Sequence, residues 1–490
     1  NNGSRETVSA EDCTFSPETL TEGLTSVTVT YNGKTALVYI TVNSENSAPK
    51  SVCVGNTDIT SGGYWTSVDG ITWTKYDGIP EDNYVYYNPD YNTLTLHNAT
   101  IHGEDCGIYV CGFPHKSVDM TIILEGENII SNTGGIRITT DSYKDTLGKD
   151  VTLTINGPGS LKVDSWQHGI NINGDSGKAT LNINNASVEA NGKDFLGRGI
   201  SLYAGVYAEF SELIININES SVTARSDFGN YRSGIYYNGT SSNDNIAKLN
   251  ISNNSAVTII GGIKTIDTAP PIPEVDDNSV LNCIVFNGND RIVYGDVELQ
   301  MDFTIKSGES MTIPEGASLS TGSYAVIVKT GGILNGVVNG TVKYAPTITT
   351  ESLVNGDVLT SYEQQLNADG DPTITWSITE GSLPEGLSLD ENTGIISGKP
   401  SAGGKYTFTV TATNSIDSYS KEFSIEINDY VLGDVNMDGN LDITDATTIQ
   451  RYVVSIPIEG TFNKELADVN QDGKITINDV TAIQIILTKK

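Results

Sequence analysis

Residues 151–163 read VTLTINGPGSLKV, and apolar and polar side chains alternate on both sides of the Asn-Gly-Pro-Gly stretch at 156–159. Alternation with a period of two is typical of a strand with one buried face, while Gly, Asn and Pro favour turns. The segment therefore predicts two short β-strands joined by a tight turn. Similar segments occur at residues 93–101, 120–130, 179–190, 212–224 and 247–259, at successive spacings of 27, 31, 28, 33 and 35 residues.

A third strand, led by glycine, follows the pair in several of these units. A unit of three strands without a helix cannot bury its apolar face alone, so successive units should stack. The predicted fold class is mainly β, with a right-handed parallel β-helix over residues 49–345 as its largest part. A β-sandwich of regular hairpins remains the alternative. The third strands read GIRIT at 135, GININ at 169, GISLY at 199 and GIYYN at 234, and side-chain ladders are expected at Asn156, Asn184 and Asn218.

Both flanks of the repeats carry local signals. Residues 25–42 alternate on both sides of Asn32-Gly33, a pair that favours a two-residue hairpin turn. This hairpin resembles the last strands of a bacterial immunoglobulin-like repeat, which implies such a module, whole or partial, at 1–48. The three prolines and three acids of TAPPIPEVDD at 268–277 predict an exposed insertion or linker. Closing coils are expected beyond it, to about residue 345.

Composition excludes several classes of function. The 490 residues include 61 Asp and Glu against 28 Lys and Arg, which gives a formal net charge of −33. Such a charge repels phosphate backbones and anionic lipids, so no nucleic-acid partner and no membrane-surface role is expected, whereas cation binding is favoured. No apolar run approaches the roughly 20 residues that span a bilayer, and no leader precedes Asn1, so a mature or shortened chain is expected. The length predicts about three or four domains.

Cysteine and histidine spacing indicates no metal site. The cysteines are Cys13, Cys53, Cys106, Cys111 and Cys283, and a local Cys106–Cys111 disulfide and buried free thiols are both open interpretations. We expect each histidine to be a surface or turn residue, because none has a partner at ligand spacing. The histidines are His97, His102, His115 and His168.

Residues 346–428 have a different character from the repeats. The stretch LPEGLSLDENTGIISGKP and the strand YTFTVTATN resemble the immunoglobulin-like modules of bacterial surface proteins. The resemblance implies a β-sandwich spacer with Trp376 in its core.

The C-terminal region contains two calcium-type loops. DVNMDGNLDITD at 434–445 and DVNQDGKITIND at 468–479 place oxygen-bearing groups at loop positions 1, 3, 5, 9 and 12, with Gly439 and Gly473 at the sharp turn. This is the pattern of an EF-hand loop with Asp in place of the final Glu, and Ca²⁺ prefers such oxygen ligands. Two calcium ions are therefore predicted. The expected ligands are Asp434, Asn436, Asp438, Asn440 (carbonyl), Asp442 and Asp445, and Asp468, Asn470, Asp472, Lys474 (carbonyl), Thr476 and Asp479.

A helical pattern follows each loop, with apolar residues at matching positions, so the two halves should pack with pseudo-twofold symmetry. About sixty residues offer little core, so metal is expected to hold the fold together. The duplicated loop and helix over 429–490 resemble a type I dockerin, the module that binds cohesin domains on the scaffoldin of a cellulosome. The segment DATTIQRY is similar to dockerins of ruminococcal gut anaerobes.

The dockerin resemblance implies a partner surface and a location. Its partner-facing residues lie at loop positions 10 and 11 and early in each helix, where this sequence departs from the common Ser-Thr and Lys-Arg pairs. The resemblance implies a secreted or cell-surface subunit of a polysaccharide-degrading complex. The residues carried over are Ile443, Thr444, Gln450 and Arg451 in the first half and Ile477, Asn478, Gln484 and Ile485 in the second.

The region at 49–345, which resembles the carbohydrate-binding-like repeats of bacterial surface proteins, allows three functions. It could bind polysaccharide through aromatic side chains, although such side chains could equally fill the coils. It could be a polysaccharide lyase or glycoside hydrolase, since two carboxylates or a base beside an acid suffice for either reaction. It could be a cell-surface adhesin. The aromatic candidates are Trp65, Trp73, Tyr203 and Tyr236, and the scattered catalytic candidates are Asp164, Asp175, Asp194, Glu209, Arg198 and Arg232.

Overall fold

The computed structural model describes residues 14–16, 26–39, 49–103, 105–113, 116–132, 134–140, 150–174, 178–194, 197–204, 211–226, 233–239, 245–266, 270–429 and 431–489. In these residues the protein is mainly β with two α-helices near the C-terminus, as predicted. None of the helices described is long and apolar enough to cross a membrane. The chain divides into two units, Asn1–Val326 with Ile333–Thr341, and Ile327–Gly332 with Val342–Lys490.

A ten-stranded sheet contains the first strand of each repeat. Partners in register lie 28, 33, 28, 34 and 34 residues apart along its parallel part, so the repeats stack directly on one another. The parallel strands are β9 (Thr93–His97), β12 (Val118–Glu125), β15 (Val151–Asn156), β18 (Lys178–Asn184), β21 (Glu212–Asn218), β24 (Ile246–Ser252) and β27 (Glu274–Val275). Three antiparallel strands extend the sheet beyond β9, namely β8 (Tyr84–Asn88), β6 (Gly63–Thr66) and β7 (Thr74–Tyr76).

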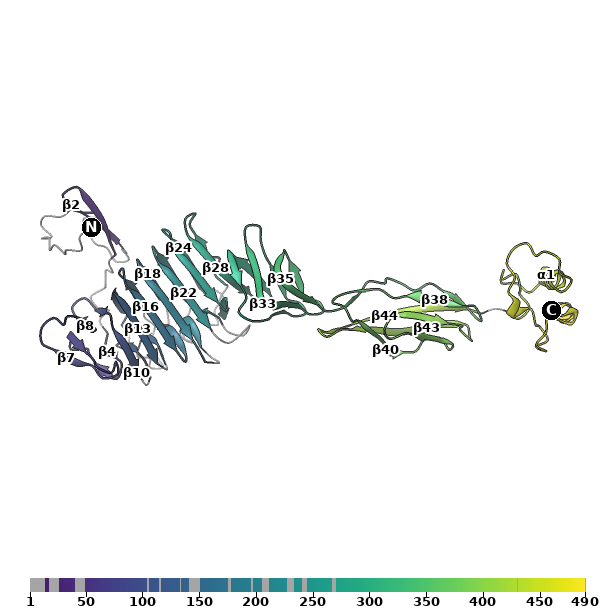
Figure 1. Cartoon of the computed structure of the whole chain (residues 1–490), viewed down its shortest axis with the longest axis horizontal. Helices are drawn as coiled ribbons and strands as arrows, with labels where there is room; N and C mark the ends of the chain where they lie inside the picture. The colour runs from purple at the N-terminus through teal and green to yellow at the C-terminus, as the bar shows by residue number, and fades with distance from the viewer. Residues whose placement is uncertain are drawn as a thin grey trace. The chain divides into compact units, whose positions relative to one another are not determined.

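The second and third strands of the repeats form two more parallel ladders. Strand pairings connect the two ladders into one 18-stranded sheet. Figure 1 shows the strands of the first unit as a stack of arrows. The second strands are β10 (Thr100–Gly103), β13 (Glu127–Asn132), β16 (Ser160–Ser165), β19 (Ser187–Gly192), β22 (Ser221–Ser226), β25 (Ala256–Ile260) and β28 (Val280–Asn287). The third strands are β11 (Ile108–Cys111), β14 (Ile136–Thr139), β17 (His168–Gly174), β20 (Arg198–Ala204), β23 (Ile235–Asn238) and β26 (Ile263–Ile266), with β4 (Ser51–Val54) and β5 (Thr57–Asp58) antiparallel beside β11.

Alternate residues of these strands form one core, because successive side chains of a strand point to opposite faces. Leu181 and Ile183 of β18 and Ile170 of β17 belong to it. Glycine leads the third strands because the backbone is crowded there. A Cβ at Gly169 would lie 2.7 Å from the carbonyl oxygen of Gly199, closer than real Cβ atoms approach.

Asparagine ladders cross the outer face of the ten-stranded sheet. The side-chain amide of Asn184 donates to that of Asn156 at 2.8 Å, so this predicted pair is confirmed. Asn218 instead accepts a bond from Ser252 at 3.1 Å. A parallel ladder that the sequence analysis missed runs from Asn250 to Asn216 at 2.7 Å, from Asn216 to Asn182 at 2.8 Å and from Asn182 to Thr154 at 3.2 Å.

Further strands lie before and after the repeats in the sequence. β2 (Ser26–Tyr31) and β3 (Lys34–Tyr39) form the predicted hairpin, and both turn residues, Asn32 and Gly33, have positive φ. The predicted insertion at 268–277 is in part a strand, because Glu274–Val275 form β27, which pairs with β24. β1 (Thr14–Ser16) pairs with β2, and after β28 come β29 (Asp290–Tyr294), β30 (Asp296–Glu298), β31 (Phe303–Ile305), β32 (Ser310–Thr312), β33 (Ser318–Val328), β34 (Ile333–Asn335) and β35 (Val338–Tyr344).

Residues 347–428 form sheets of their own around a separate core. Trp376 lies in that core, as predicted, and Gly394 at φ +71 packs against its indole ring. One sheet contains β37 (Gly356–Asp357), β44 (Ser418–Asn428), β43 (Gly404–Thr413) and β40 (Thr375–Gly381), and a second contains β38 (Tyr362–Gln365), β42 (Ile395–Gly398) and β41 (Leu387–Leu389), beside the pair β36 (Thr347–Ile348) and β39 (Ala368–Asp369).

The C-terminal part is helical. It contains α1 (Ile443–Val453), a 3₁₀ turn (Lys464–Leu466) and α2 (Ile477–Lys489). Ala446 and Ile449 of α1 meet Val480 and Ile483 of α2 in a small core. Each helix directly follows one predicted loop, so matched loop–helix halves form the module.

Candidate functional sites

The first loop folds around its own carboxylates. The side chain of Asp434 accepts the backbone N–H groups of Asp438 at 3.2 Å and Gly439 at 2.9 Å. At the other end, Asp445 accepts from Val435 at 3.0 Å and from Asp442 at 2.9 Å. Asp442 in turn caps α1, because its side chain accepts hydrogen bonds from the backbone N–H groups of Thr444 and Asp445. The side chain of Asp445, at position 12, therefore connects the two ends of the loop by hydrogen bonds.

The second loop repeats this arrangement. The carboxylate of Asp468 accepts from Asp472 at 3.1 Å and Gly473 at 2.7 Å, and that of Asp479 accepts from Asn470 at 3.1 Å and Thr476 at 2.7 Å. The difference lies at position 9, where the Thr476 hydroxyl takes the place of the Asp442 carboxylate. The second loop therefore offers one negative charge fewer.

The loops fit a hard cation. Asp434, Asp445 and Asp479 are completely buried, and no ion pair to a basic side chain is found for them among the described residues. Burial raises the pKa of Asp445, and the neighbouring charges of Asp434 and Asp442 raise it further, although backbone hydrogen bonds oppose this. Buried carboxylates without a cation are costly, and Ca²⁺ neutralises such a set.

Side-chain acids alone do not complete the shell. Within the described residues, no group of three or more His, Cys, Asp or Glu side chains is arranged to hold a metal ion. The remaining oxygens at these loops belong to the side chains of Asn436 and Asn470 and to main-chain carbonyls, which are ligand types that Ca²⁺ accepts. The donor set therefore suits Ca²⁺ and not a d-block metal.

The predicted partner-facing residues lie at the surface of both halves. Ile443 and Ile477, at position 10 of each loop, are 58% and 51% exposed, and Ile485 of α2 is 49% exposed. Their matching places in the two halves make these exposed apolar side chains candidates for a protein interface, whose buried core is largely apolar. Arg451 is half-buried. The rest of the set is exposed as well, namely Thr444, Gln450, Asn478 and Gln484.

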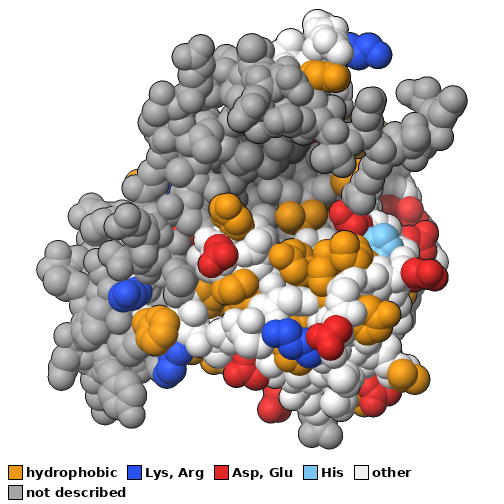
Figure 2. Space-filling model, turned by 90° about the vertical axis from the view of Figure 1, so that its left-hand side faces the viewer, with side chains coloured by type: hydrophobic (Ala, Val, Ile, Leu, Met, Phe, Trp, Pro, Cys, Tyr) orange, Lys and Arg blue, Asp and Glu red, His pale blue; other side chains and the backbone are white. Residues whose placement is uncertain are grey.

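Three of the four aromatic candidates for sugar stacking are buried. The side chains of Trp65, Trp73 and Tyr236 are only 9%, 2% and 6% exposed, so their rings have no open face for a sugar. For these three the prediction is corrected, because they pack instead. Tyr203 is half-buried and forms a hydrogen bond with Arg198. Open aromatic rings occur instead at Tyr91, Trp166 and Tyr76. Figure 2 shows the left-hand side of the view in Figure 1, where several hydrophobic side chains lie at the surface.

The structure describes three of the catalytic candidates, Asp164, Asp194 and Arg198. Asp164 on β16 accepts a bond from Asn191 and pairs with Lys193 at 3.4 Å. Arg198 belongs to β20 of the other ladder, and Asp194 lies in the turn before it. Asp175, Glu209 and Arg232 lie outside the described residues, as do Cys13 and His115. The described thiols, Cys53, Cys106, Cys111 and Cys283, are free.

The sequence analysis missed a polar groove over β4, β11, β14 and β17. A cavity of about 620 Å³ is lined there by Tyr109, Arg137, His168 and Asn171, with Asp105 as its acid. The signal that was missed is the residue after Gly-Ile in each repeat. These residues form a row across the strands, because each pairs in register with the next. The row runs through Tyr109, Arg137, Asn171, Ser201, Tyr236 and Lys264. His168 also departs from expectation, since it lies within a strand, partly buried.

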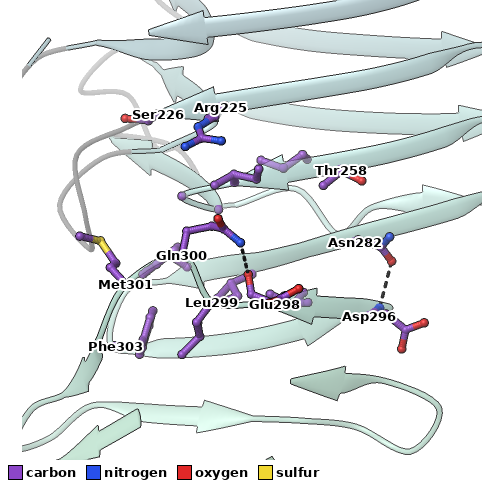
Figure 3. A pocket seen from close by; sticks show the side chains of 17 residues that line it. Arg225, Ser226, Thr258, Asn282, Asp296, Glu298, Leu299, Gln300, Met301 and Phe303 are labelled. Atoms are coloured by element: carbon purple, nitrogen blue, oxygen red, sulfur yellow. Dashed lines mark hydrogen bonds between the residues drawn. The ribbon is translucent and has the colours of Figure 1, made fainter. Parts of the chain in front are cut away.

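A second cavity, of about 140 Å³, lies beside the last repeats (Figure 3). Ile259, Leu299 and Phe303 give it a largely apolar lining. Figure 3 shows two hydrogen bonds at this cavity: the backbone N–H of Asp296 donates to Asn282 at 2.9 Å, and the Gln300 amide donates to the Glu298 carbonyl at 3.5 Å. The ionisable side chains of the cavity lining are those of Arg225, Asp296 and Glu298.

Two families match parts of the chain. Residues 432–487 match the dockerin type I domain, and residues 345–428 match the family described as "Putative Ig domain". Type I dockerins are calcium-binding modules, which agrees with the loop chemistry. No curated protein matches the chain.

Several solved structures resemble short parts of it. A Bacteroides fragilis protein described as a "putative alpha-galactosidase/melibiase" is 33% identical, with 18% of each chain covered and a TM-score of 0.17. A SusE-like surface located polysaccharide binding protein of Bacteroides thetaiotaomicron is 26% identical, with 20% of this chain and 16% of that chain covered and a TM-score of 0.15. The chain therefore spans a fifth or less of either protein.

Proposed function

We propose that this chain is an extracellular subunit of a cellulosome-like assembly, in which residues 429–490 bind a scaffoldin cohesin in a Ca²⁺-dependent way. The duplicated loop–helix unit carries this proposal, because each half presents an exposed isoleucine beside a loop with at least one completely buried carboxylate, whose charge a bound cation would neutralise. Asp434, Asp438, Asp442 and Asp445 would hold one ion, together with Asn436 and the Asn440 carbonyl. The ion would fix the loop, while the surface of α1 makes the contacts.

The second half would act in the same way. Asp468, Asp472 and Asp479 would hold the second ion with Asn470, Thr476 and the Lys474 carbonyl. Two similar faces on one module would allow cohesin to bind in either of two orientations, unless their different side chains make one face the stronger.

We further propose that residues 49–345 form a right-handed parallel β-helix that binds polysaccharide or presents it to partner enzymes. The parallel ladders, with three strands in each repeat, support this fold. Residues 346–428 would act as a spacer, and residues 1–48 as a further immunoglobulin-like module. A lyase or glycosidase activity of the same region, or a role as a cell-surface adhesin, is the alternative.

Binding of the whole chain to immobilised cohesins, with and without Ca²⁺, tests the docking function. We expect binding in millimolar Ca²⁺ that is lost in EDTA and returns with added Ca²⁺. Equal binding in both conditions would refute the calcium-dependent mechanism, and no binding to any type I cohesin would refute the docking function. Incubation of the same chain with polysaccharides, followed by product analysis, separates a binding subunit from an enzyme.

A further inference from the structure

The outer face of β14, β17 and β20 contains buried polar atoms without partners. The Nδ1 atom of His168, the Oδ1 atom of Asn171 and the Oγ atom of Ser201 have no hydrogen-bond partner in the part of the chain that the structure describes. Asn171 and Ser201 pair in register on neighbouring strands, about 4.8 Å apart. Buried polar groups are nearly always hydrogen-bonded, so a cluster of unsatisfied ones indicates a missing partner.

Two arginines flank these atoms. Arg137 pairs in register with Asn171, and Arg198 with His168. Neither guanidinium forms an ion pair with a carboxylate among the described residues. The lysines of the neighbouring ladders behave differently, since Lys162 pairs with Glu189 at 2.9 Å and Lys178 with Glu212 at 3.3 Å. In a chain with a net charge of −33, two arginines on one face, without a carboxylate ion-pair partner among the described residues, form a local site for an anion, with Asp105 as the acid of the cavity lining.

Aromatic rings hold one of these guanidinium groups in place. The Cζ atom of Arg198 lies 3.4 Å from the centre of the Tyr236 ring and 5.9 Å from that of Tyr203, and the Tyr203 hydroxyl accepts one of its N–H groups. Stacking leaves the other N–H groups at the edge of the guanidinium available. This explains why Tyr236 is buried although its position faces outward.

We propose that this groove binds the carboxylate of an acidic sugar, with Arg137 and Arg198 holding the carboxylate and Asn171, Ser201 and His168 bonding ring hydroxyls. A guanidinium matches a carboxylate in a two-point contact, and hydroxyls can both donate to and accept from the unsatisfied atoms. Arg137 is exposed to solvent and lines the cavity, so a polymer could lie across the strands. This inference rests on the proposed glycan-binding role of residues 49–345 and specifies its ligand as a uronate-containing polysaccharide.

The test uses one polymer with and without its charge. Retardation of the whole chain in gels containing polygalacturonate should be strong, and retardation by the fully methyl-esterified polymer should be weak. Arg137→Gln should weaken retention by polygalacturonate about 10- to 100-fold, the effect of losing a charged hydrogen bond. Lys162→Gln removes the same charge outside the groove and should change retention less than twofold. The unfolding temperature of each variant shows that it is folded.

Each outcome decides between the hypotheses. Equal retention by the two polymers, or equal effects of the Arg137 and Lys162 substitutions, overturns the carboxylate site. Retention by a sulfated galactan but not by polygalacturonate overturns it as well. If neutral polysaccharides are retained and acidic ones are not, the glycan-binding role stands and this inference alone fails. If no polysaccharide of either kind is retained while cohesin still binds, both the glycan-binding role and this inference fail, and the docking function stands.

Discussion

Asp434 and Asp445, the first and last ligand positions of the first loop, are both completely buried, and the charge of Asp434 adds to the effect of burial in raising the pKa of Asp445. Two such carboxylates destabilise the loop unless a cation lies between them. We therefore expect EDTA to lower the stability of the C-terminal module by about 4 kcal/mol relative to Ca²⁺ at a thousandfold excess over Kd. Calorimetry of the whole chain should show one transition that moves with Ca²⁺ and others that stay. A module transition that ignores EDTA would contradict this prediction.

The two loops should bind Ca²⁺ unequally, because position 9 is Asp442 in one and Thr476 in the other. We expect Thr476→Asp to tighten the weaker site about tenfold and Asp442→Thr to weaken the stronger one. Both residue types can cap the following helix, so helix stability is matched between the variants. Calcium titration calorimetry measures both sites. Identical affinities in the unaltered chain would disprove the asymmetry.

Cohesin binding should depend on both isoleucine faces. If either face can dock, Ile443→Asp and Ile477→Asp should each reduce affinity by no more than about twofold, and the double variant should reduce it at least 100-fold, since buried apolar contacts would be replaced by unpaired charges. If one single variant alone abolishes binding, only one face is used. Thr461→Asp, at an exposed position in the segment between α1 and the 3₁₀ turn, serves as the charge control.

Gly394 and Trp376 should be energetically coupled. A Cβ at Gly394 would lie 2.7 Å from the indole ring, and its φ of +71 strains any other residue. We expect Gly394→Ala to destabilise the module at 346–428 by about 1–3 kcal/mol. Trp376→Leu removes the clash at the cost of a cavity. The double variant should therefore lose less stability than the sum of the single ones. Additive losses in thermal unfolding would show that the ring contact is unimportant.

Acid should weaken the first unit through His168. Burial, together with the positive charges of Arg198 and Arg137, lowers the pKa of His168 to about 4. The unfolded chain, with an ordinary histidine pKa of about 6.5, then binds more protons below that pH, so stability falls as pH decreases. The loss should be about 1.5 kcal/mol between pH 6.5 and 5. His168→Gln, which keeps a polar side chain next to Tyr203 and both arginines, should remove this part of the slope. An unchanged slope in the variant would assign it to other groups.

The sequence predicted the periodic features well, because they depend on local patterns. Alternating strands such as β15 and β18 bury the residues that the alternation selects, and the hairpin at Asn32-Gly33 follows from two turn residues alone. The DxNxDG loops and the helices after them also follow from spacing. In each case a residue and its partners lie close together in the chain.

The groove could not be predicted in the same way, because it depends on register between repeats of unequal length. Arg137, Asn171 and Ser201 become neighbours only when units offset by about 30 residues stack, and the lengths of the intervening loops decide which residues align. Burial of Trp73 and Tyr236 was missed for a related reason. Aromatic rings satisfy both a binding pattern and a packing pattern, and only the positions of their neighbours distinguish the two.

The end strands of the ten-stranded sheet also limit how the protein can self-associate. β7 has three residues and exposes Lys75, and β27 has two residues directly after Pro270, Pro271 and Pro273. Long open edges would recruit further copies end to end and lead to fibres, whereas short, charged or proline-flanked edges resist such growth. These two edges should therefore not pair with further copies of the chain, and the number of copies in a larger complex would be set by the number of docking sites.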